Sequence, residues 1–479
     1  MTNHISTTVR NRGRRLVVLG VVTAAAAAAV AVSGASGGGA SGSAAGGANR
    51  TSACPFKGGQ IKAFMTADKA GNTGDLGLGT VRSALLSVDL VNKAGGILGC
   101  KFVLDIAEEG FPDVDVCLRA YRSAIQSRKY DFYFGSTGSG CMASVTALTN
   151  AAKKAIIANQ AADHQPFFNP KFQTYNFHAA VSTFLEGRAS AAFAVSKGWK
   201  TGAVLAPNYA YGQDAAKAFV QYFQSHGGKV LAQQFPEFNE KNFTPFINAV
   251  LAKKPQMIFS AFFAGFVIPF WKQWKEGGHD TVPAIGGLID TPGWELVKSA
   301  SQIPKNSYAY DRGAWQLLAQ TPTGRQFTNA YVAKYGKSAH PVPLSWGEAF
   351  WSGVVMAKAL IEKSHSLNPD DWVKTVEKGD FTFQGPFHVG PTPVDPINHM
   401  ADNCAQVGLL RFNGAVKVKA QYNLKDFKNI CMHDILSDAE AKKLTTNPRV
   451  GAAAIAAYDK AVAAVKRADR KVPLIASGS

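Results

Sequence analysis

Residue patterns that carry catalysis or bind metals are scarce in this sequence. Its ten histidines include no H-E-x-x-H pair and its six cysteines include no C-x-x-C pair, which argues against a metal site. The glycine-rich stretch GSTGSG (135–140) lacks the Gly-Lys-Ser/Thr ending of a phosphate-binding loop. Ser139 also lacks the outer glycine spacing of a nucleophile elbow. We therefore expect no cofactor, no metal and no enzymatic activity.

Acidic residues are also few. The chain has 33 Asp and Glu against 51 Lys and Arg, a formal net charge of +18. Residues 1–50 hold five arginines and no acid, so the rest of the chain carries 46 basic and 33 acidic residues, or +13. Its lysines are spread singly, without a basic stripe that alternates with aromatic residues. We therefore expect a scattered cationic surface and no nucleic-acid interface.

Long apolar runs are absent after residue 33. The one such run, LVVLGVVTAAAAAAVAV (16–32), follows four arginines and precedes a tract of Gly, Ser and Ala. This order predicts an exported protein with a signal peptide over 1–33 and a flexible linker over 34–54. Three alternatives stay open: twin-arginine export, an uncleaved N-terminal membrane anchor, and a lipid anchor on Cys54. The expected location is the periplasm or the cell surface.

The six cysteines of an exported chain favour disulfides. Fifteen pairings are possible, and the simplest joins sequence neighbours within a domain. We expect Cys54–Cys100, Cys117–Cys141 and Cys404–Cys431. Cys54 precedes the first expected strand and Cys100 opens the second, so both would lie at the same end of adjacent parallel strands.

Strand and helix patterns alternate along the chain. The expected strands are 60–65, 101–106, 130–134, 154–158, 201–206, 229–234, 256–260, 282–286, 386–389 and 406–411. The expected helices are 78–93, 114–127, 140–152, 183–197, 212–226, 243–253, 265–276, 324–335, 346–363 and 369–377. Such alternation predicts an α/β fold with parallel sheets, here in two lobes that are built alike. Open α/β sheets bind ligands at the carboxyl ends of their strands.

Five stretches of the sequence follow one another in a recognisable order. They are VNKAGGILGCKF, YDFYFGSTGSGC with AIIANQAADHQP, NYAYGQDAAKAFVQYFQSHGGKV, FPEFNEKNFTPFINAVLAKKPQMIF and FQGPFHVGP. Together they resemble the type I periplasmic binding proteins, specifically the branched-chain amino acid (Leu/Ile/Val-type) substrate-binding proteins of ABC transporters. The resemblance covers about residues 57–425, and Cys117 and Cys141 match a cysteine pair of the classical members.

The resemblance implies two Rossmann-like lobes that are joined by a three-crossover hinge and trap a small ligand between them. It places lobe I at 55–178 and 312–380, and lobe II at 179–311 and 381–425. Residues 426–479 form a C-terminal extension, whose helical run GAAAIAAYDKAVAAVKRADRK we expect to pack on a lobe; docking of a partner is the alternative. The implied protein is a monomer that delivers its ligand to an ABC transporter permease, with a ligand-sensing receptor as the second hypothesis.

In amino acid-binding members, hydroxyls and backbone N–H groups of two lobe I loops bind the ligand carboxylate; here these loops are Gly135–Met142 and Asn159–Asp163. The residues that the resemblance assigns to the ligand are Ser136, Thr137, Ser139, Gln160, Ala161, Ala162, Tyr209, Tyr211, Phe263, Asp290 and Trp346. Packing is the alternative role of Tyr211, Phe263 and Trp346. Helix capping is the alternative role of Ser136, Thr137 and Asp290.

The sequence departs from the family pattern where charges of an amino acid would bind. Met142 stands where serine is common, Ala161 and Ala162 offer only backbone donors, and Asp290 lies further from its strand than the usual acid. A buried zwitterion needs charge-assisted partners. We expect a branched-chain or other hydrophobic amino acid as the ligand, with an amide, an aromatic acid or another small carbon compound as the alternative.

Overall fold

The structure is a computed structural model, and its chain divides into two units, Met1–Arg50 and Thr51–Ser479. It describes residues 53–69, 74–158, 174–263, 267–279, 281–286, 306–311, 321–336, 345–386, 388–412, 422–436 and 446–470. All of them belong to the second unit, so the predicted signal peptide and nearly all of the predicted linker lie outside the described residues. Among the described helices, none combines the length and apolar character that a membrane crossing requires.

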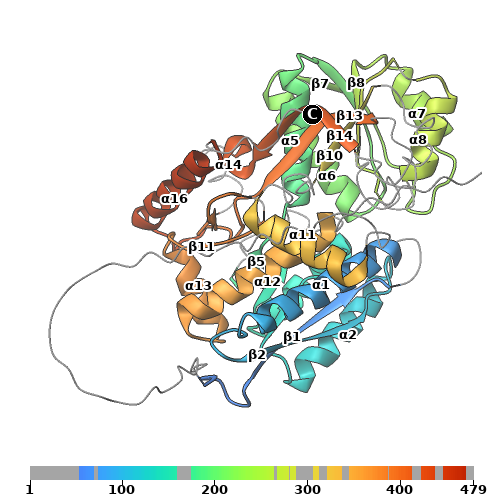
Figure 1. The fold of residues 1–479 in the computed structure, drawn as a ribbon. Helices are drawn as coiled ribbons and strands as arrows, with labels where there is room; N and C mark the ends of the chain where they lie inside the picture. The colour runs from blue at the N-terminus through green and yellow to red at the C-terminus, as the bar shows by residue number, and fades with distance from the viewer. Residues whose placement is uncertain are drawn as a thin grey trace, which may run out of the picture. The chain divides into compact units, whose positions relative to one another are not determined.

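The first sheet has five parallel strands in the order β2-β1-β3-β4-β5. Its strands are β1 (Gln60–Ala67), β2 (Lys101–Glu108), β3 (Phe132–Phe134), β4 (Ile156–Ala158) and β5 (Asn176–His178). Its helices are α1 (Gly74–Lys93), α2 (Val114–Ser127) and α3 (Ser139–Ala151), joined by α11 (Pro322–Tyr335), α12 (Ser345–Ser364) and α13 (Pro369–Glu377). Figure 1 shows α11 and α12 beside α1, and α13 packs on α12; together they complete what we call lobe I.

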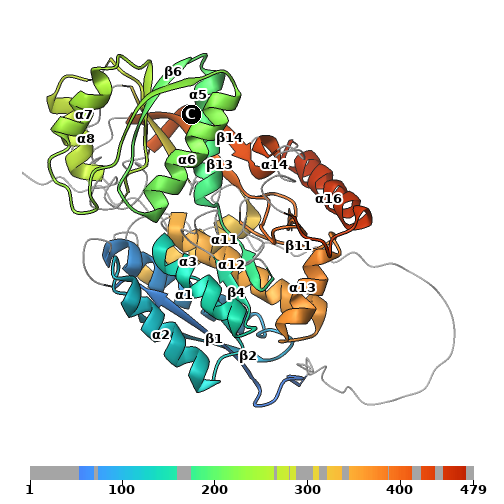
Figure 2. The same cartoon turned by 180° about the vertical axis from the view of Figure 1, so that it is seen from behind.

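The second sheet has seven strands in the order β14-β13-β10-β9-β8-β6-β7. Its strands are β6 (Thr201–Leu205), β7 (Lys229–Gln234), β8 (Met257–Ser260), β9 (Ala284–Gly286), β10 (Ser307–Asp311), β13 (Cys404–Phe412) and β14 (Tyr422–Cys431). Strands β6 to β10 are parallel, whereas β13 and β14 are antiparallel to their neighbours. With α5 (Thr183–Ser196), α6 (Ala210–Ser225), α7 (Thr244–Leu251) and α8 (Val267–Glu276) this sheet forms what we call lobe II (Figure 2). The predicted fold of two parallel-sheet α/β lobes is confirmed.

Local sequence chemistry sets the ends of these elements. Gly95 and Gly96 follow α1 with φ of +98° and +78°, a region that glycine enters without steric cost. A Cβ on Gly96 would lie 2.0 Å from the carbonyl oxygen of Cys100, so no other residue fits this turn. Asp113 caps α2 by accepting the N–H of Asp115, the usual role of Asp at a helix N-terminus.

The two lobes bury apolar layers between their sheets and helices. In lobe I, the three side chains of the aromatic strand β3 are all buried. Phe132 and Phe134 pack on α13 and α12, and Tyr133 packs on Tyr121 of α2. In lobe II, α5 and α6 lie against each other at Gly187, where a Cβ would come within 2.4 Å of the Ala215 carbonyl oxygen. Glycine at this point lets the two helix backbones approach closely.

Three disulfides join the cysteine pairs that the sequence predicts: Cys54–Cys100, Cys117–Cys141 and Cys404–Cys431. The first pair closes the shared end of β1 and β2, because Gln60 pairs with Lys101 in the strand register. The last pair lies directly across the β13–β14 ladder.

The C-terminal part differs from the expected element pattern in one place. The strand expected at 386–389 is wrong; short strands β11 (Thr382–Phe383) and β12 (Thr392–Pro393) lie on either side of it. Pro386 begins the segment and Pro391 follows it, and proline cannot donate to a strand ladder. The domain boundary expected at residue 425 falls within β14.

Beyond the second sheet, the described part of the chain forms the helices α14 (Met432–Ile435) and α16 (Ala452–Arg470). Both views show them side by side (Figures 1 and 2). Val462 and Val465 of α16 are buried. Ala454 of the same helix lies close to Gly379: a Cβ on Gly379 would come within 1.9 Å of the carbonyl oxygen of Ala454. In the described part of the chain, this helix of the extension packs on the protein itself.

Candidate functional site

A cavity of about 240 Å³ lies where strand ends of the two sheets meet. From lobe I come the segment after β2 and the start of α3; from lobe II come the segments after β6 and β7. Its lining residues are Glu109, Phe111, Pro112, Asp113, Val114, Gly140, Cys141, Tyr209, Ala210 and Phe238. Because the carboxyl ends of parallel strands are where α/β sheets bind ligands, this cavity is the leading candidate for a functional site.

Aromatic side chains form the wall that both lobes share. The ring of Phe111 from lobe I lies 4.9 Å from Phe238 and 5.9 Å from Tyr209, measured between centroids. Phe263 adds a ring 5.8 Å from Tyr209 and 6.5 Å from Phe111. Such edge-to-face and tilted pairs suit aromatic quadrupoles, so the cavity has an apolar wall able to hold an apolar or aromatic group.

Glu109 is the buried acid of this cavity, and only 1 % of it is exposed. Its carboxylate accepts the backbone N–H of Thr137 at 2.8 Å and of Gly138 at 2.6 Å, and the Thr66 hydroxyl at 3.2 Å. Burial raises the pKa of Glu109 to about 7 because it removes water from the charge; these hydrogen bonds lower it, and the nearby charge of Asp68 raises it further. Near neutral pH this acid therefore exists in both protonation states.

The same carboxylate holds the backbone just before α3. Gly138 is the N-cap residue of α3 and has no side chain to cap the helix. The Glu109 carboxylate accepts the N–H of Gly138 itself and that of Thr137 before it. A Cβ on Gly138 would lie 2.7 Å from the Phe111 ring and 3.1 Å from the Glu109 carboxylate. Glycine is required here because the acid and the ring approach the backbone so closely.

Three of the predicted hydroxyl residues lie at this helix start. Ser136, Thr137 and Ser139 are all buried. The Ser136 hydroxyl donates to the carbonyl oxygen of Gly138 at 3.1 Å. Within the described part of the chain, the hydroxyls of Thr137 and Ser139 have no hydrogen-bond partner, a costly state for buried polar groups.

The predicted aromatic residues divide between the cavity and the core behind it. Tyr209 lines the cavity. Tyr211 is buried, its ring lies 5.2 Å from that of Phe263, and its hydroxyl is 2.7 Å from the hydroxyl of Tyr310. Phe263 is buried against these rings and is not among the lining residues.

The remaining predicted site residues cannot be placed. Gln160, Ala161, Ala162 and Asp290 lie outside the described residues. Trp346 belongs to the first turn of α12, but its side chain is outside the described part.

Sequence reasoning missed Glu109, Phe111 and Phe238. Two signals could have found them, since the stretches EEGFPD and FPEFN each follow a strand. The rule that parallel strands present their carboxyl ends to ligands applies to these two loops as well.

A second cavity of about 210 Å³ lies between α14 and α16. It is lined by Asp395, Pro396, Ile397, Met432, His433, Leu436, Ile455, Tyr458, Asp459, Val462 and Lys466. In the described part of the chain, one group of potential metal ligands lies near it: Cys431, His433 and Asp434. Because the Cys431 sulfur is bonded to Cys404, it offers no thiolate to a metal.

The sequence profile of a family described as periplasmic binding protein matches residues 60–415. No curated protein matches the sequence. Every lining residue of the first cavity lies inside the matched region, whereas most of those of the second lie beyond it. The family match thus favours the cavity at Glu109 as the functional one.

Solved structures share the fold at low sequence identity. A solute-binding protein of an ABC transporter from R. palustris, in complex with 4-hydroxybenzoate, is 17% identical over 78% of this chain and 97% of its own, with a TM-score of 0.66. A periplasmic binding protein from Burkholderia mallei is 19% identical over 80% and 97%, also with a TM-score of 0.66. A putative branched-chain amino acid ABC transporter protein from Rhodospirillum rubrum is 18% identical over 76% and 100%, with a TM-score of 0.56.

Proposed function

The chain belongs to the periplasmic binding protein family, and from this premise we propose that it traps a small organic ligand in the cavity at Glu109 and delivers it to an ABC importer. Proteins of this family bind substrates and are not enzymes, and they are exported. The observation that carries the proposal is the cavity itself, since its walls come from strand ends of both lobes. Export by the segment at 1–33 to the periplasm or the cell surface is part of the proposal.

The size and wall of the cavity support a ligand with an apolar or aromatic body. A cavity of about 150 Å³ lined by apolar side chains holds benzene, so about 240 Å³ has room for one substituted ring. Two of the similar solute-binding proteins are complexes with 4-hydroxybenzoate and benzoate. The amino acid that the sequence predicts is the second candidate, supported by the likeness to the Rhodospirillum rubrum protein.

The proposed mechanism is closure of the lobes around the ligand. Phe111 reaches the ligand from lobe I, and Tyr209 and Phe238 reach it from lobe II. A ligand makes both sets of contacts only when the lobes are together, so binding shifts the population toward the closed state. A membrane permease that recognises this state would receive only loaded protein.

A thermal-shift screen of the purified protein tests this proposal. A ligand at 100 times its dissociation constant adds about 2.7 kcal/mol to the free energy of unfolding, which raises the melting temperature by a few degrees. The panel contains amino acids, amides, alcohols, amines and aromatic acids. Stabilisation by one chemical class is the expected result, and a panel without any stabilising compound would contradict the proposal.

Replacing Tyr209 with Ala should weaken ligand binding by roughly ten- to a hundredfold, because the ligand loses about 1.5–3 kcal/mol of aromatic contact. Tyr209 is only half-buried and its side chain does not cap α6, so the fold should persist. Titration calorimetry with the best compound of the screen measures the loss. Tyr222→Ala, near the other end of α6, is the matched control, and equal affinities of the two variants would count against the assignment.

A further inference from the structure

Two backbone N–H groups just before the first residue of α3 are occupied by a side chain of the protein. The Glu109 carboxylate accepts the N–H groups of Thr137 and Gly138 at 2.8 and 2.6 Å. Helix N-termini attract anions through such N–H groups and through the helix dipole. A ligand carboxylate that approached this end of the cavity would find these two donors taken and a second carboxylate beside them.

We propose that Glu109 is a specificity-determining residue: it excludes ligand carboxylates from its end of the cavity and selects ligands that carry a neutral or cationic hydrogen-bond donor, such as an amide, an alcohol or an amine. The inference rests on the proposed function, because it names the class of ligand that the same cavity takes. Glu109 lines the cavity, and its carboxylate oxygens are acceptors for such a donor.

Like-charge repulsion makes this selection strong. A ligand carboxylate about 4 Å from the ionised Glu109 is repelled strongly. Protonation of Glu109, whose pKa is about 7, relieves this repulsion and limits the loss of affinity to about thirtyfold at pH 8.5. Described acids around the cavity add to the effect: Asp113 lines it and Asp68 is buried near Glu109. The aromatic wall formed by Phe111, Tyr209 and Phe238 holds the apolar body of the ligand in either case, so only the head group distinguishes an acid from its amide.

A purely structural role is the rival explanation. Glu109 accepts the N–H of Gly138, the N-cap residue of α3, and this bond at the helix end alone would stabilise the lobe without choosing a ligand. The two roles differ in one measurable quantity, the ratio of affinities for an acid and its own amide. Loss of such a bond lowers stability and leaves that ratio unchanged.

The test compares matched pairs of compounds by titration calorimetry at about pH 8.5, where Glu109 is ionised. The pairs are benzoate with benzamide, phenylacetate with phenylacetamide, and L-leucine with L-leucinamide. The intact protein should bind the amide of at least one pair about thirtyfold more tightly than the acid. Glu109→Gln should reduce this preference to less than about threefold, while Glu276→Gln, which changes an exposed acid of α8, should leave it unchanged. In the intact protein, affinity for the acid should also rise at about pH 5.5.

The outcomes separate the two proposals. The intact protein could bind an acid more tightly than its amide, with the same ratio of affinities in Glu109→Gln. This result would overturn the role of Glu109 and leave the binding function standing. A preference for the amide that survives in both Glu109→Gln and Glu109→Ala would also overturn it. If no compound of either kind binds any of the proteins, the proposed function fails, and this inference fails with it.

Discussion

Replacing Glu109 with Gln should flatten the pH dependence of stability between about pH 4.5 and pH 7. Burial raises the pKa of Glu109 from 4.5 to about 7 in the folded protein. The folded state therefore holds this proton more tightly than the unfolded state does. The resulting stability is fully present below pH 4.5 and is lost as the pH rises through 7, a change of about 3 kcal/mol over 2.5 pH units. Glutamine carries no charge and should not show this fall.

Urea unfolding of both proteins at several pH values between 4.5 and 8 measures the difference. Burial also raises the pKa values of Asp214 and Asp395 to about 6, so the intact protein and the variant share their contribution. The ionisable groups around Glu109 itself, Asp68 and Tyr121, remain in both. The difference between the two curves thus isolates Glu109, and parallel curves would show that its carboxyl group is not held in the protonated form by burial.

The alternation of strands and helices could be predicted because each element carries its own periodicity. Helix α2 and strand β7 begin and end at the predicted residues, 114–127 and 229–234. Strand β14 could not be predicted, because its sequence YNLKDFKNIC mixes charged and apolar residues without a regular alternation. Strand β14 is stabilised by its partner β13, because it pairs along the whole of β13 and is bonded to it by the disulfide Cys404–Cys431.

The candidate site was predictable in part for a related reason. The hydroxyl-rich loop at 136–139 stands out in the sequence, and Tyr209 follows a recognisable strand. Glu109 does not stand out in the sequence, because its role in the site depends on hydrogen bonds with Thr66 from β1 and with Thr137 and Gly138 before α3. A raised pKa results from burial by segments far apart in the chain, and no local pattern encodes it.

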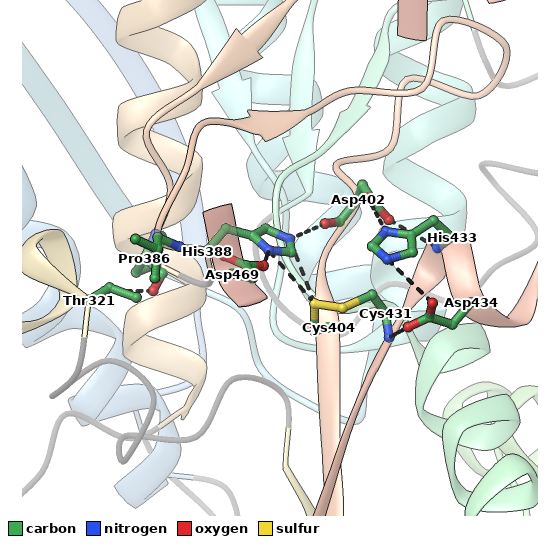
Figure 3. A network of polar contacts seen from close by, with 10 residues as sticks. Thr321, Pro386, His388, Asp402, Cys404, Cys431, His433, Asp434 and Asp469 are labelled. Atoms are coloured by element: carbon green, nitrogen blue, oxygen red, sulfur yellow. Dashed lines mark hydrogen bonds and ion pairs between the residues drawn. A yellow bond between two sulfur atoms is a disulfide. The ribbon is translucent and has the colours of Figure 1, made fainter. Parts of the chain in front are cut away.

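Replacing Asp469 with Ala should cost about 3 kcal/mol of stability and release α16 from the protein. Asp469 accepts the backbone N–H of Val389 at 2.9 Å and binds Nδ1 of the buried His388 at 2.6 Å (Figure 3). The other ring nitrogen of His388, Nε2, lies 2.5 Å from the carbonyl oxygen of Asp402. A carboxylate and a carbonyl oxygen both accept hydrogen bonds, so both ring nitrogens donate and the ring is an imidazolium.

Asp469 therefore neutralises a buried charge. Burial lowers the pKa of His388, but the hydrogen bond to Asp469 and the charges of Asp469 and Asp402 outweigh it and raise the pKa. The stability that comes from this pair is present below about pH 6.5 and is lost as the pH rises through the raised pKa of His388. Removal of one partner of a buried ion pair leaves the other uncompensated, which costs about 3 kcal/mol or more.

Three variants compare the loss of stability when different groups are removed. Asp469→Ala removes both the charge and the acceptor for Val389, whereas Asp469→Asn keeps an acceptor and should cost less. Asp459→Ala changes an exposed acid of the same helix and should change stability by less than about 0.5 kcal/mol. Backbone hydrogen exchange then distinguishes release of α16 from general unfolding: fast exchange confined to Ala452–Arg470 in Asp469→Ala is the expected result. Unchanged protection of this helix would mean that its buried valines hold it in place without the ion pair.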